Sequence, residues 1–254
     1  MGIFALFQRQ LIYFPDSAPV PPAGEIIEGA RDVRLRTSDG LALSAWFVPP
    51  GPGADLRMAV LVAPGNGGNR TSRVGLATEL SRRGLGVLLM DYRGYGGNAG
   101  SPSEDGLARD AMAAALALEE LGYPAERTIY FGESLGTGVV AALQARRTPA
   151  GMVLRSPFPE LADVGAHHYP WLPVRLLLKD EFRTSERLSE SQVPVTVVYA
   201  DRDSVVPTEL SARVADNATS LVERVVVSGA DHNDEVMFGP RVADAVARLA
   251  KVVG

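Results

Sequence analysis

Residues 128–138, TIYFGESLGTG, constrain the fold more than any other stretch of this chain. Four β-favouring residues run into the pentapeptide GESLG at 132–136, and a small, apolar, helix-prone run follows. This order predicts a strand, a forced turn and a helix. A serine at such a corner projects its hydroxyl from the tip of a sheet on a sparsely populated backbone conformation, and the flanking glycines relieve the crowding. The stretch therefore predicts Ser134 as a nucleophile, with an ordinary strand-to-helix turn as the alternative.

The same alternation of strand and helix patterns extends over most of the chain. Short apolar runs indicate buried strands, and a helical pattern follows most of them. Alternating strands and helices imply a mainly parallel, doubly wound sheet with right-handed crossovers. Two β-rich segments joined by a Ser-Asp-Gly turn add an antiparallel hairpin near the N-terminus. The predicted strands are 32–37 and 41–48 in the hairpin, then 58–63, 86–90, 128–131, one from 151 to 154, 193–200 and 221–227, with a helix ending at residue 83 and another at 104–121.

Composition excludes several classes of function. Of the 254 residues, 46% are hydrophobic and 22% are charged, which is ordinary for a folded globular protein. The net charge of -5 offers no broad attraction to nucleic acid, so no nucleic-acid partner is expected. The absence of cysteine excludes disulfides, a thiolate nucleophile and thiolate metal sites. The length suits one large α/β domain, which we assign to residues 21–254.

Residues 1–20 form an N-terminal apolar segment. It begins MGIFALFQRQLIYFP, with two short apolar clusters that cannot span a membrane and lack the marks of a signal peptide. We expect a strand or helix that packs on the domain. The alternative is an interfacial anchor, in which residues 3–14 contact a membrane, or the stub of a longer anchor. We expect a cytoplasmic or peripherally membrane-associated protein.

One long stretch, residues 156–191, breaks the alternation of strands and helices. It is too long for a simple connection and is rich in large apolar residues, which predicts a short helical cap over the active face. Its large side chains are candidates for the lining of an acyl pocket, although their spacing is also typical of a helix core. They are Tyr169, Trp171, Leu172, Leu176, Leu177 and Phe182.

A serine hydroxyl needs a base to become a nucleophile, and a histidine held by a carboxylate is the usual solution. The chain contains three histidines. Reactive groups gather at the carboxyl ends of parallel strands, and His232 lies just beyond such an end, in the loop GADHND. We therefore predict His232 as the base. His167 and His168 lie in the insertion, where we expect packing or hydrogen bonding within the cap, because a metal site there lacks further ligands.

The carboxylate partner of His232 should leave the preceding strand, where YADRDSVVP supplies Asp201 and Asp203. Position along the chain does not separate these two. The site also needs two backbone N–H groups to bind an oxyanion, and Leu135, the residue after the nucleophile, supplies one. For the second we choose Asn66 in the loop PGNGGN, whose glycines let the backbone approach a substrate. A nest or plain loop is the alternative there, whereas a P-loop is excluded because no Gly-Lys-Ser/Thr follows.

Together these blocks resemble the α/β-hydrolase superfamily, whose triads run serine, acid, histidine along the chain. More narrowly, the sequence is similar to small serine hydrolases that include bacterial carboxylesterases and eukaryotic protein depalmitoylases. The family pattern Asp-x-x-Val-Pro falls on Asp203, so the resemblance selects Asp203 over Asp201. Relatives usually have histidine where this chain has Pro64, so the resemblance does not specify the conformation of that loop. The matching blocks are QRQLIYFP, PGNGGNR, DYRGYGGNAGSPSEDGL, GESLGTG, SPFPELADVGAHHYPWLPVRLLLKDEF, DRDSVVP and GADHND.

The resemblance implies an α/β-hydrolase fold with a short cap and a catalytic triad of Ser134, Asp203 and His232. It implies a serine hydrolase that cleaves small-molecule carboxylic esters or thioesters of apolar acyl groups, without a cofactor. A serine peptidase or amidase of the same fold and a non-catalytic binding module are the alternatives. Relatives with an aspartate nucleophile are excluded because Ser134 occupies that position.

Overall fold

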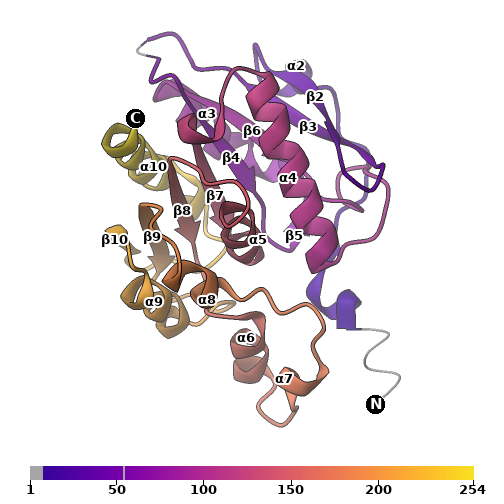
Figure 1. Ribbon diagram of the computed structural model, residues 1–254, viewed down its shortest axis with the longest axis vertical. Helices are drawn as coiled ribbons and strands as arrows, with labels where there is room; N and C mark the ends of the chain where they lie inside the picture. The colour runs from indigo at the N-terminus through magenta and orange to yellow at the C-terminus, as the bar shows by residue number, and fades with distance from the viewer. Residues whose placement is uncertain (1–7, 54) are drawn as a thin grey trace.

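The computed structural model describes residues 8–53 and 55–254. At its centre lies an eight-stranded sheet with the strand order β10-β9-β8-β7-β4-β6-β3-β2 (Figure 1). Neighbouring strands are parallel except for β3, which is antiparallel to β2 and to β6. The predicted mainly parallel sheet with an N-terminal hairpin is therefore confirmed. The strands are β2 Arg31–Arg36, β3 Ala42–Val48, β4 Met58–Ala63, β6 Leu85–Met90, β7 Thr128–Glu133, β8 Gly151–Arg155, β9 Val195–Ala200 and β10 Leu221–Val227.

Helices cover both faces of this sheet. Helices α3 and α10 pack together on one face, and α4 and α5 pack together on the other (Figure 1). The helices are α2 Ala23–Ile26, α3 Val74–Arg82, α4 Glu104–Glu120, α5 Leu135–Gln144, α6 Leu161–His168, α7 Val174–Leu177, α8 Thr184–Ser189, α9 Thr208–Asn217 and α10 Pro240–Val253, with 3₁₀ turns η1 Arg70–Arg73, η2 Ala125–Arg127 and η3 Glu235–Phe238.

The sequence of β4, MAVLVA, accounts for the two layers. Val60 and Val62 belong to the core that α3 and α10 cover, whereas Ala59, Leu61 and Ala63 belong to the core that α4 and α5 cover. Successive side chains of a strand point to opposite faces, so an unbroken apolar run requires cover on both.

Local signals explain where individual helices begin. The hydroxyl of Ser103 accepts a hydrogen bond from the backbone N–H of Gly106 at 3.1 Å and so caps α4. Glu104 and Asp105 in the first turn interact favourably with the helix dipole. Helix α10 begins at Pro240. Proline is tolerated there because the backbone N–H of the first helical residue has no partner within the helix.

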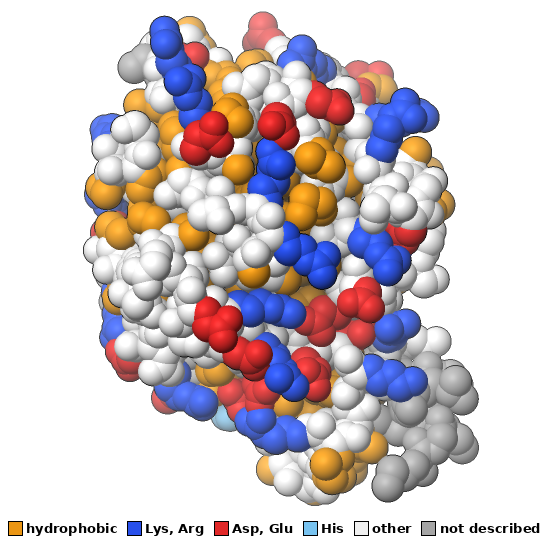
Figure 2. All heavy atoms as spheres, in the orientation of Figure 1, with side chains coloured by type: hydrophobic (Ala, Val, Ile, Leu, Met, Phe, Trp, Pro, Cys, Tyr) orange, Lys and Arg blue, Asp and Glu red, His pale blue; other side chains and the backbone are white. Residues whose placement is uncertain are grey.

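Residues 156–191 contain α6, α7 and α8, as expected of a helical insertion. Helices α6 and α7 lie at the lower end of the molecule in Figure 1, and Figure 2 shows hydrophobic side chains at the surface over α7. Trp171 is 77% exposed and Leu176 is 84% exposed. Elsewhere on the face shown in Figure 2, acidic and basic side chains are interspersed.

The described part of the N-terminal segment packs on the domain, as predicted. Residues 8–12 are helical, and β1 (Phe14–Pro15) pairs with β5 (Gly67–Gly68). Arg9 and the hydroxyl of Tyr13 both bind the carboxylate of Asp180, at 3.1 and 2.8 Å. Of the predicted membrane-contacting stretch 3–14, residues 3–7 lie outside the described residues. Within the described ranges, no helix combines the length and the apolarity needed to cross a bilayer.

Candidate active site

Strand β7 ends directly before Ser134, and α5 begins directly after it. Ser134 has φ 50° and ψ −115°, a conformation that side-chain-bearing residues rarely adopt. A Cβ at Gly132 would lie 2.7 Å from the carbonyl oxygen of Gly136, and one at Gly136 would collide with the carbonyl oxygens of Ala63 and Pro64. Both flanking glycines are therefore sterically required, as the sequence predicted.

The loops after β10 and β9 bring His232 and Asp203 together. Nδ1 of His232 lies 2.8 Å from Oδ2 and 3.0 Å from Oδ1 of Asp203, and both side chains are buried. Asp201 instead accepts a hydrogen bond from the N–H of Gly229 at 2.7 Å, in a neighbouring turn. Asp203 is thus the aspartate that contacts the imidazole. When Nδ1 donates to it, Nε2 is left as a hydrogen-bond acceptor.

The carboxylate of Asp203 is held in its ionised form. Burial works to raise its pKa, but the hydrogen bond and charge of His232 and the amide of Val206 outweigh burial and lower that pKa below its ordinary value. Oδ1 accepts hydrogen bonds from the N–H groups of Val205 at 3.0 Å and Val206 at 2.7 Å. The carboxylate therefore keeps a fixed orientation toward the imidazole.

A second acid, Asp231, connects the two loops, and the sequence reasoning missed it. Its Oδ1 accepts hydrogen bonds from the backbone N–H groups of Ser204 at 2.7 Å and His232 at 2.6 Å. These bonds lower the pKa of Asp231 below its usual range. The only signal in the sequence is its position directly before the histidine in GADHND.

The loop after β4 carries Asn66, whose backbone is held from two sides. Its carbonyl accepts hydrogen bonds from the N–H of Phe14 and the hydroxyl of Tyr95, both at 2.8 Å. Its side-chain amide donates to the carbonyl of Ile12 at 2.8 Å. Within residues 8–53 and 55–254, no hydrogen-bond acceptor is found for the backbone N–H of Asn66 or of Leu135, the first residue of α5. Asn66 lines the pocket, and the role of both amides in an oxyanion hole stays a prediction.

Two buried side chains fix the rest of this loop. The hydroxyl of Tyr92 donates to the carbonyl of Pro64 at 2.9 Å. Nη1 of Arg73 donates to the carbonyls of Gly67 at 3.3 Å and Asn69 at 3.1 Å. These hydrogen bonds therefore stabilise the loop that begins at Pro64.

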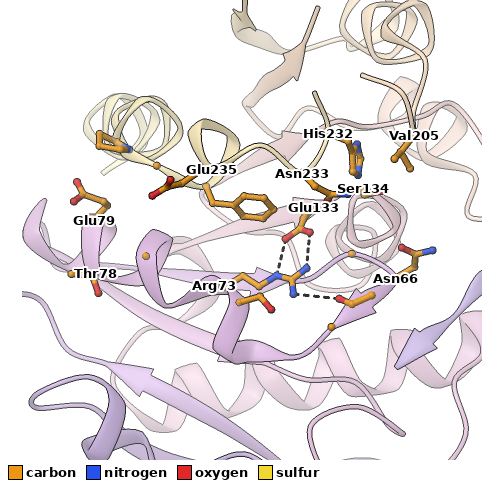
Figure 3. A pocket seen from close by; sticks show the side chains of 18 of the residues that line it. Asn66, Arg73, Thr78, Glu79, Glu133, Ser134, Val205, His232, Asn233 and Glu235 are labelled. Carbon is orange, nitrogen blue, oxygen red and sulfur yellow. Dashed lines mark hydrogen bonds and ion pairs between the residues drawn. The ribbon is translucent and has the colours of Figure 1, made fainter. Parts of the chain in front are cut away.

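Arg73 belongs to a buried charged cluster that the sequence reasoning also missed. Its guanidinium donates to the carboxylate of Glu133 at 2.6 and 3.0 Å (Figure 3), and Nη2 of Arg155 lies 3.2 Å from the same carboxylate. Nη1 of Arg155 donates to the backbone carbonyl of His232 at 2.8 Å. The cluster of Arg73, Glu133 and Arg155 therefore links the loops that carry Asn66, Ser134 and His232. A charged residue in the otherwise apolar run of β7 was the available signal.

Electrostatic balance holds this cluster together. Burial opposes ionisation of Glu133, but the charges of Arg73 and Arg155 outweigh burial and hold its pKa at about 2. Burial lowers the pKa of Arg155, against the opposing charge of Glu133. The carboxylate of Glu133 thus lies between two buried guanidiniums, and the negative charge of Asp203 also favours the charged form of Arg155, so the charges beneath the site partly compensate one another.

A pocket of about 970 Å³ opens over this arrangement. Both Ser134 and His232 line it, and Figure 3 shows them at one end, with Thr78 and Glu79 at the other. Its volume is in the range of small-molecule sites. The structure therefore places a strained serine and a carboxylate-bound imidazole on one cavity.

The large side chains of the insertion were candidates for an acyl lining, but they do not line this pocket. Of the described residues that line the pocket, none lies between 156 and 191, so the insertion stands beside the cavity rather than over it. The segment of Trp171 and Leu176 turns outward to solvent, and Phe182 is buried in the core, where it contacts the backbone at Gly138. Of Trp171, Leu176 and Phe182, only Phe182 packs in the core, which was the alternative expected for these side chains.

The remaining histidines, His167 and His168, lie at the end of α6. Their rings pack edge to face with centroids 5.2 Å apart, and Nε2 of His168 lies 2.8 Å from the carbonyl oxygen of Val205. The hydrogen bond of His168 thus leaves the insertion, whereas the prediction kept it within. In the part of the chain that the structure describes, no three His, Asp or Glu side chains are grouped as metal ligands.

Comparison with known proteins adds relatives to this geometry. Residues 59–193 match the model of the alpha/beta hydrolase fold family. An uncharacterized protein of Mycobacterium tuberculosis is 48% identical over 244 residues, which cover 95% of this chain and 86% of that protein. The human alpha/beta hydrolase domain-containing protein 17B is 30% identical over 80% of this chain and 69% of its own length.

Solved structures show the same fold. An esterase of Pyrococcus furiosus superposes with a TM-score of 0.74 at 19% identity, over 95% of this chain and 97% of the esterase. The esterase domain of a Rhodothermus marinus protein superposes with a TM-score of 0.67, also at 19% identity, over 89% of this chain and all of that domain.

Proposed function

Because the chain belongs to the α/β-hydrolase fold family, we propose that it is a serine hydrolase that cleaves carboxylic esters or thioesters of apolar acyl groups. The observation that carries the proposal is the bond between His232 Nδ1 and Asp203, which leaves Nε2 as the acceptor of an imidazole that lines the same cavity as Ser134. This is the arrangement that a hydroxyl nucleophile needs.

In the proposed acylation step, Nε2 of His232 takes the hydroxyl proton of Ser134 while Oγ bonds to the substrate carbonyl carbon. The carbonyl oxygen becomes an oxyanion, which the N–H groups of Asn66 and Leu135 bind. The bond to the alcohol or thiol then breaks, and the imidazolium protonates the leaving group. The same imidazole then takes a proton from a water molecule, whose oxygen bonds to the acyl carbon. The bond from that carbon to Oγ of Ser134 breaks, the imidazolium returns its proton to Oγ, and the carboxylic acid leaves.

Asp203 does not exchange protons in this scheme. Its ionised carboxylate stabilises the imidazolium that forms in each step and keeps Nδ1 protonated, so that Nε2 remains the reacting nitrogen. The lowered pKa of Asp203 supports this role. The cluster of Arg73, Glu133 and Arg155 helps to position the imidazole, because Arg155 donates a hydrogen bond to the backbone carbonyl of His232.

The test compares wild type with Ser134→Ala. We expect wild type to hydrolyse p-nitrophenyl esters and an acyl-thioester and to be labelled by a fluorophosphonate probe, and the variant to lose both properties. Retained labelling at another serine would reject the nucleophile. An absence of turnover and labelling in wild type would favour a non-catalytic module, and cleavage of peptides but not esters would favour a peptidase.

A further inference from the structure

The pocket does not run under the insertion but along a groove on the α3 side of the sheet. From Ser134 it extends between α3 and the segment formed by η3 and the start of α10. Phe238, Gly239 and Pro240 line it from that segment. The groove is thus separate from the exposed side chains of Trp171 and Leu176.

One face of α3 forms the length of the groove. Gly75, Thr78, Glu79 and Arg82 all line it, and their spacing of three and four residues puts them on one side of a helix. The opposite side, with Leu76, Ala77 and Leu80, is buried against the sheet. From Gly75 to Glu79, where the charged part of the groove begins, the helix rises about 6 Å, roughly the length of four methylene groups, and this part of the path adds to the part between Ser134 and Gly75.

The groove is open beside Gly75, near the N-terminal end of α3. A glycine inside a helix is unfavourable relative to alanine, yet a Cβ at Gly75 would meet no atom within 4 Å. Packing therefore does not require glycine there, and the space beside Gly75 belongs to the open groove. The distal end is different in character, since Glu79 forms ion pairs with Arg82 at 2.9 Å and Arg83 at 2.6 Å.

We propose that this groove binds the acyl chain, and that the substrates are esters or thioesters of medium-length acyl groups, about as long as octanoyl. The inference rests on the proposed function. The acyl group stays bound during both acylation and deacylation, whereas the alcohol or thiol leaves after acylation. A path with two walls that starts at Ser134 therefore suits the acyl group better. The path ends at the charged pair of Glu79 and Arg82, where further methylenes gain no apolar contact.

The test measures kcat/KM for p-nitrophenyl acetate, butyrate, octanoate and laurate. For wild type we expect a rise of about fourfold per methylene up to octanoate and no further rise to laurate. Gly75→Phe fills the path, and the octanoate-to-acetate ratio should fall on the order of 100-fold, the loss of about four buried methylenes. Thr78→Trp is a second filling variant for the case that Gly75→Phe does not fold.

Trp171→Ala is the matched control, because it removes an aromatic side chain of the insertion and should leave the octanoate-to-acetate ratio unchanged. Fluorophosphonate labelling reports whether each variant retains a reactive serine. An unchanged ratio in the labelled groove variants, or a fall in Trp171→Ala, would refute the groove. If the groove variants instead alter selectivity among acetate esters of longer alcohols, the assignment to the acyl chain is wrong. Failure of the proposed function is distinct, since wild type would then neither react with the probe nor hydrolyse any ester.

Discussion

Replacing Glu133 with glutamine tests whether the buried charges beneath the site stabilise the fold. The substitution keeps the shape of the side chain and removes its charge. Arg73 and Arg155 would then face each other in the interior without the carboxylate that lies 2.6 and 3.2 Å from them. Because these guanidiniums also hold the loops of Asn69 and His232, we expect both stability and turnover to fall.

Two arguments give the expected loss of unfolding free energy in Glu133→Gln. Breaking a buried ion pair by removing one partner costs about 3 to 5 kcal/mol of unfolding free energy. Independently, lowering the pKa of Glu133 from its ordinary 4.5 to about 2 corresponds to about 3 kcal/mol at neutral pH. The folded-state pKa is below the unfolded one, so this stabilisation is complete above pH 4.5 and is lost as the pH falls toward 2.

The assay is urea unfolding of wild type and Glu133→Gln at pH 7 and pH 3. We expect a difference of about 3 kcal/mol at pH 7 and roughly half of it at pH 3. Glu223→Gln is the matched control, because Glu223 pairs with Arg248 through two similar hydrogen bonds at 2.8 and 3.1 Å but at the surface. The control should lose less than about 1 kcal/mol. Equal stability of wild type and Glu133→Gln, or a difference that does not change with pH, would refute the reasoning.

Two further predictions concern the triad and the turn. Asp203→Asn should lower kcat by about 10⁴-fold because the imidazole then adopts the wrong tautomer, whereas Asp201→Asn, which alters only a turn, should stay within a fewfold of wild type; the opposite result would exchange the two aspartates. Gly132→Ala should destabilise the protein in thermal unfolding by about 1 to 3 kcal/mol because its Cβ meets backbone at 2.7 Å, while Gly75→Ala, with open space around the new methyl group, should stabilise it by up to about 1 kcal/mol.

Most of the fold and the residues proposed to react could be predicted from local sequence. The strand–GESLG–helix stretch places Ser134 at a corner, and steric exclusion around its glycines is a property of a few consecutive residues. The apolar runs of the strands and the helical patterns between them identify the parallel sheet, because each depends on neighbours in sequence. His232 follows from the rule that reactive groups gather at the carboxyl ends of such strands.

The choice between Asp201 and Asp203 could not be made from position, because the two differ by two residues in one loop. The structure separates them by the direction of each carboxylate, one toward His232 Nδ1 and the other toward Gly229. Similarly, no local pattern reveals that Glu133, Arg73 and Arg155 meet, since they lie on three segments of the chain.

The sequence by itself determined the alternation of elements, the strained turn and the candidate nucleophile and base, because these depend on steric and periodic constraints between near neighbours. Tertiary structure alone decided where the cavity lies. Large apolar residues in 156–191 were compatible with an acyl lining or a helix core, but exposure is a property of packing, and the segment turns Trp171 and Leu176 to solvent. The groove lies along α3 instead, where small and polar residues gave no apolar signal and only the approach of the η3–α10 segment builds a second wall.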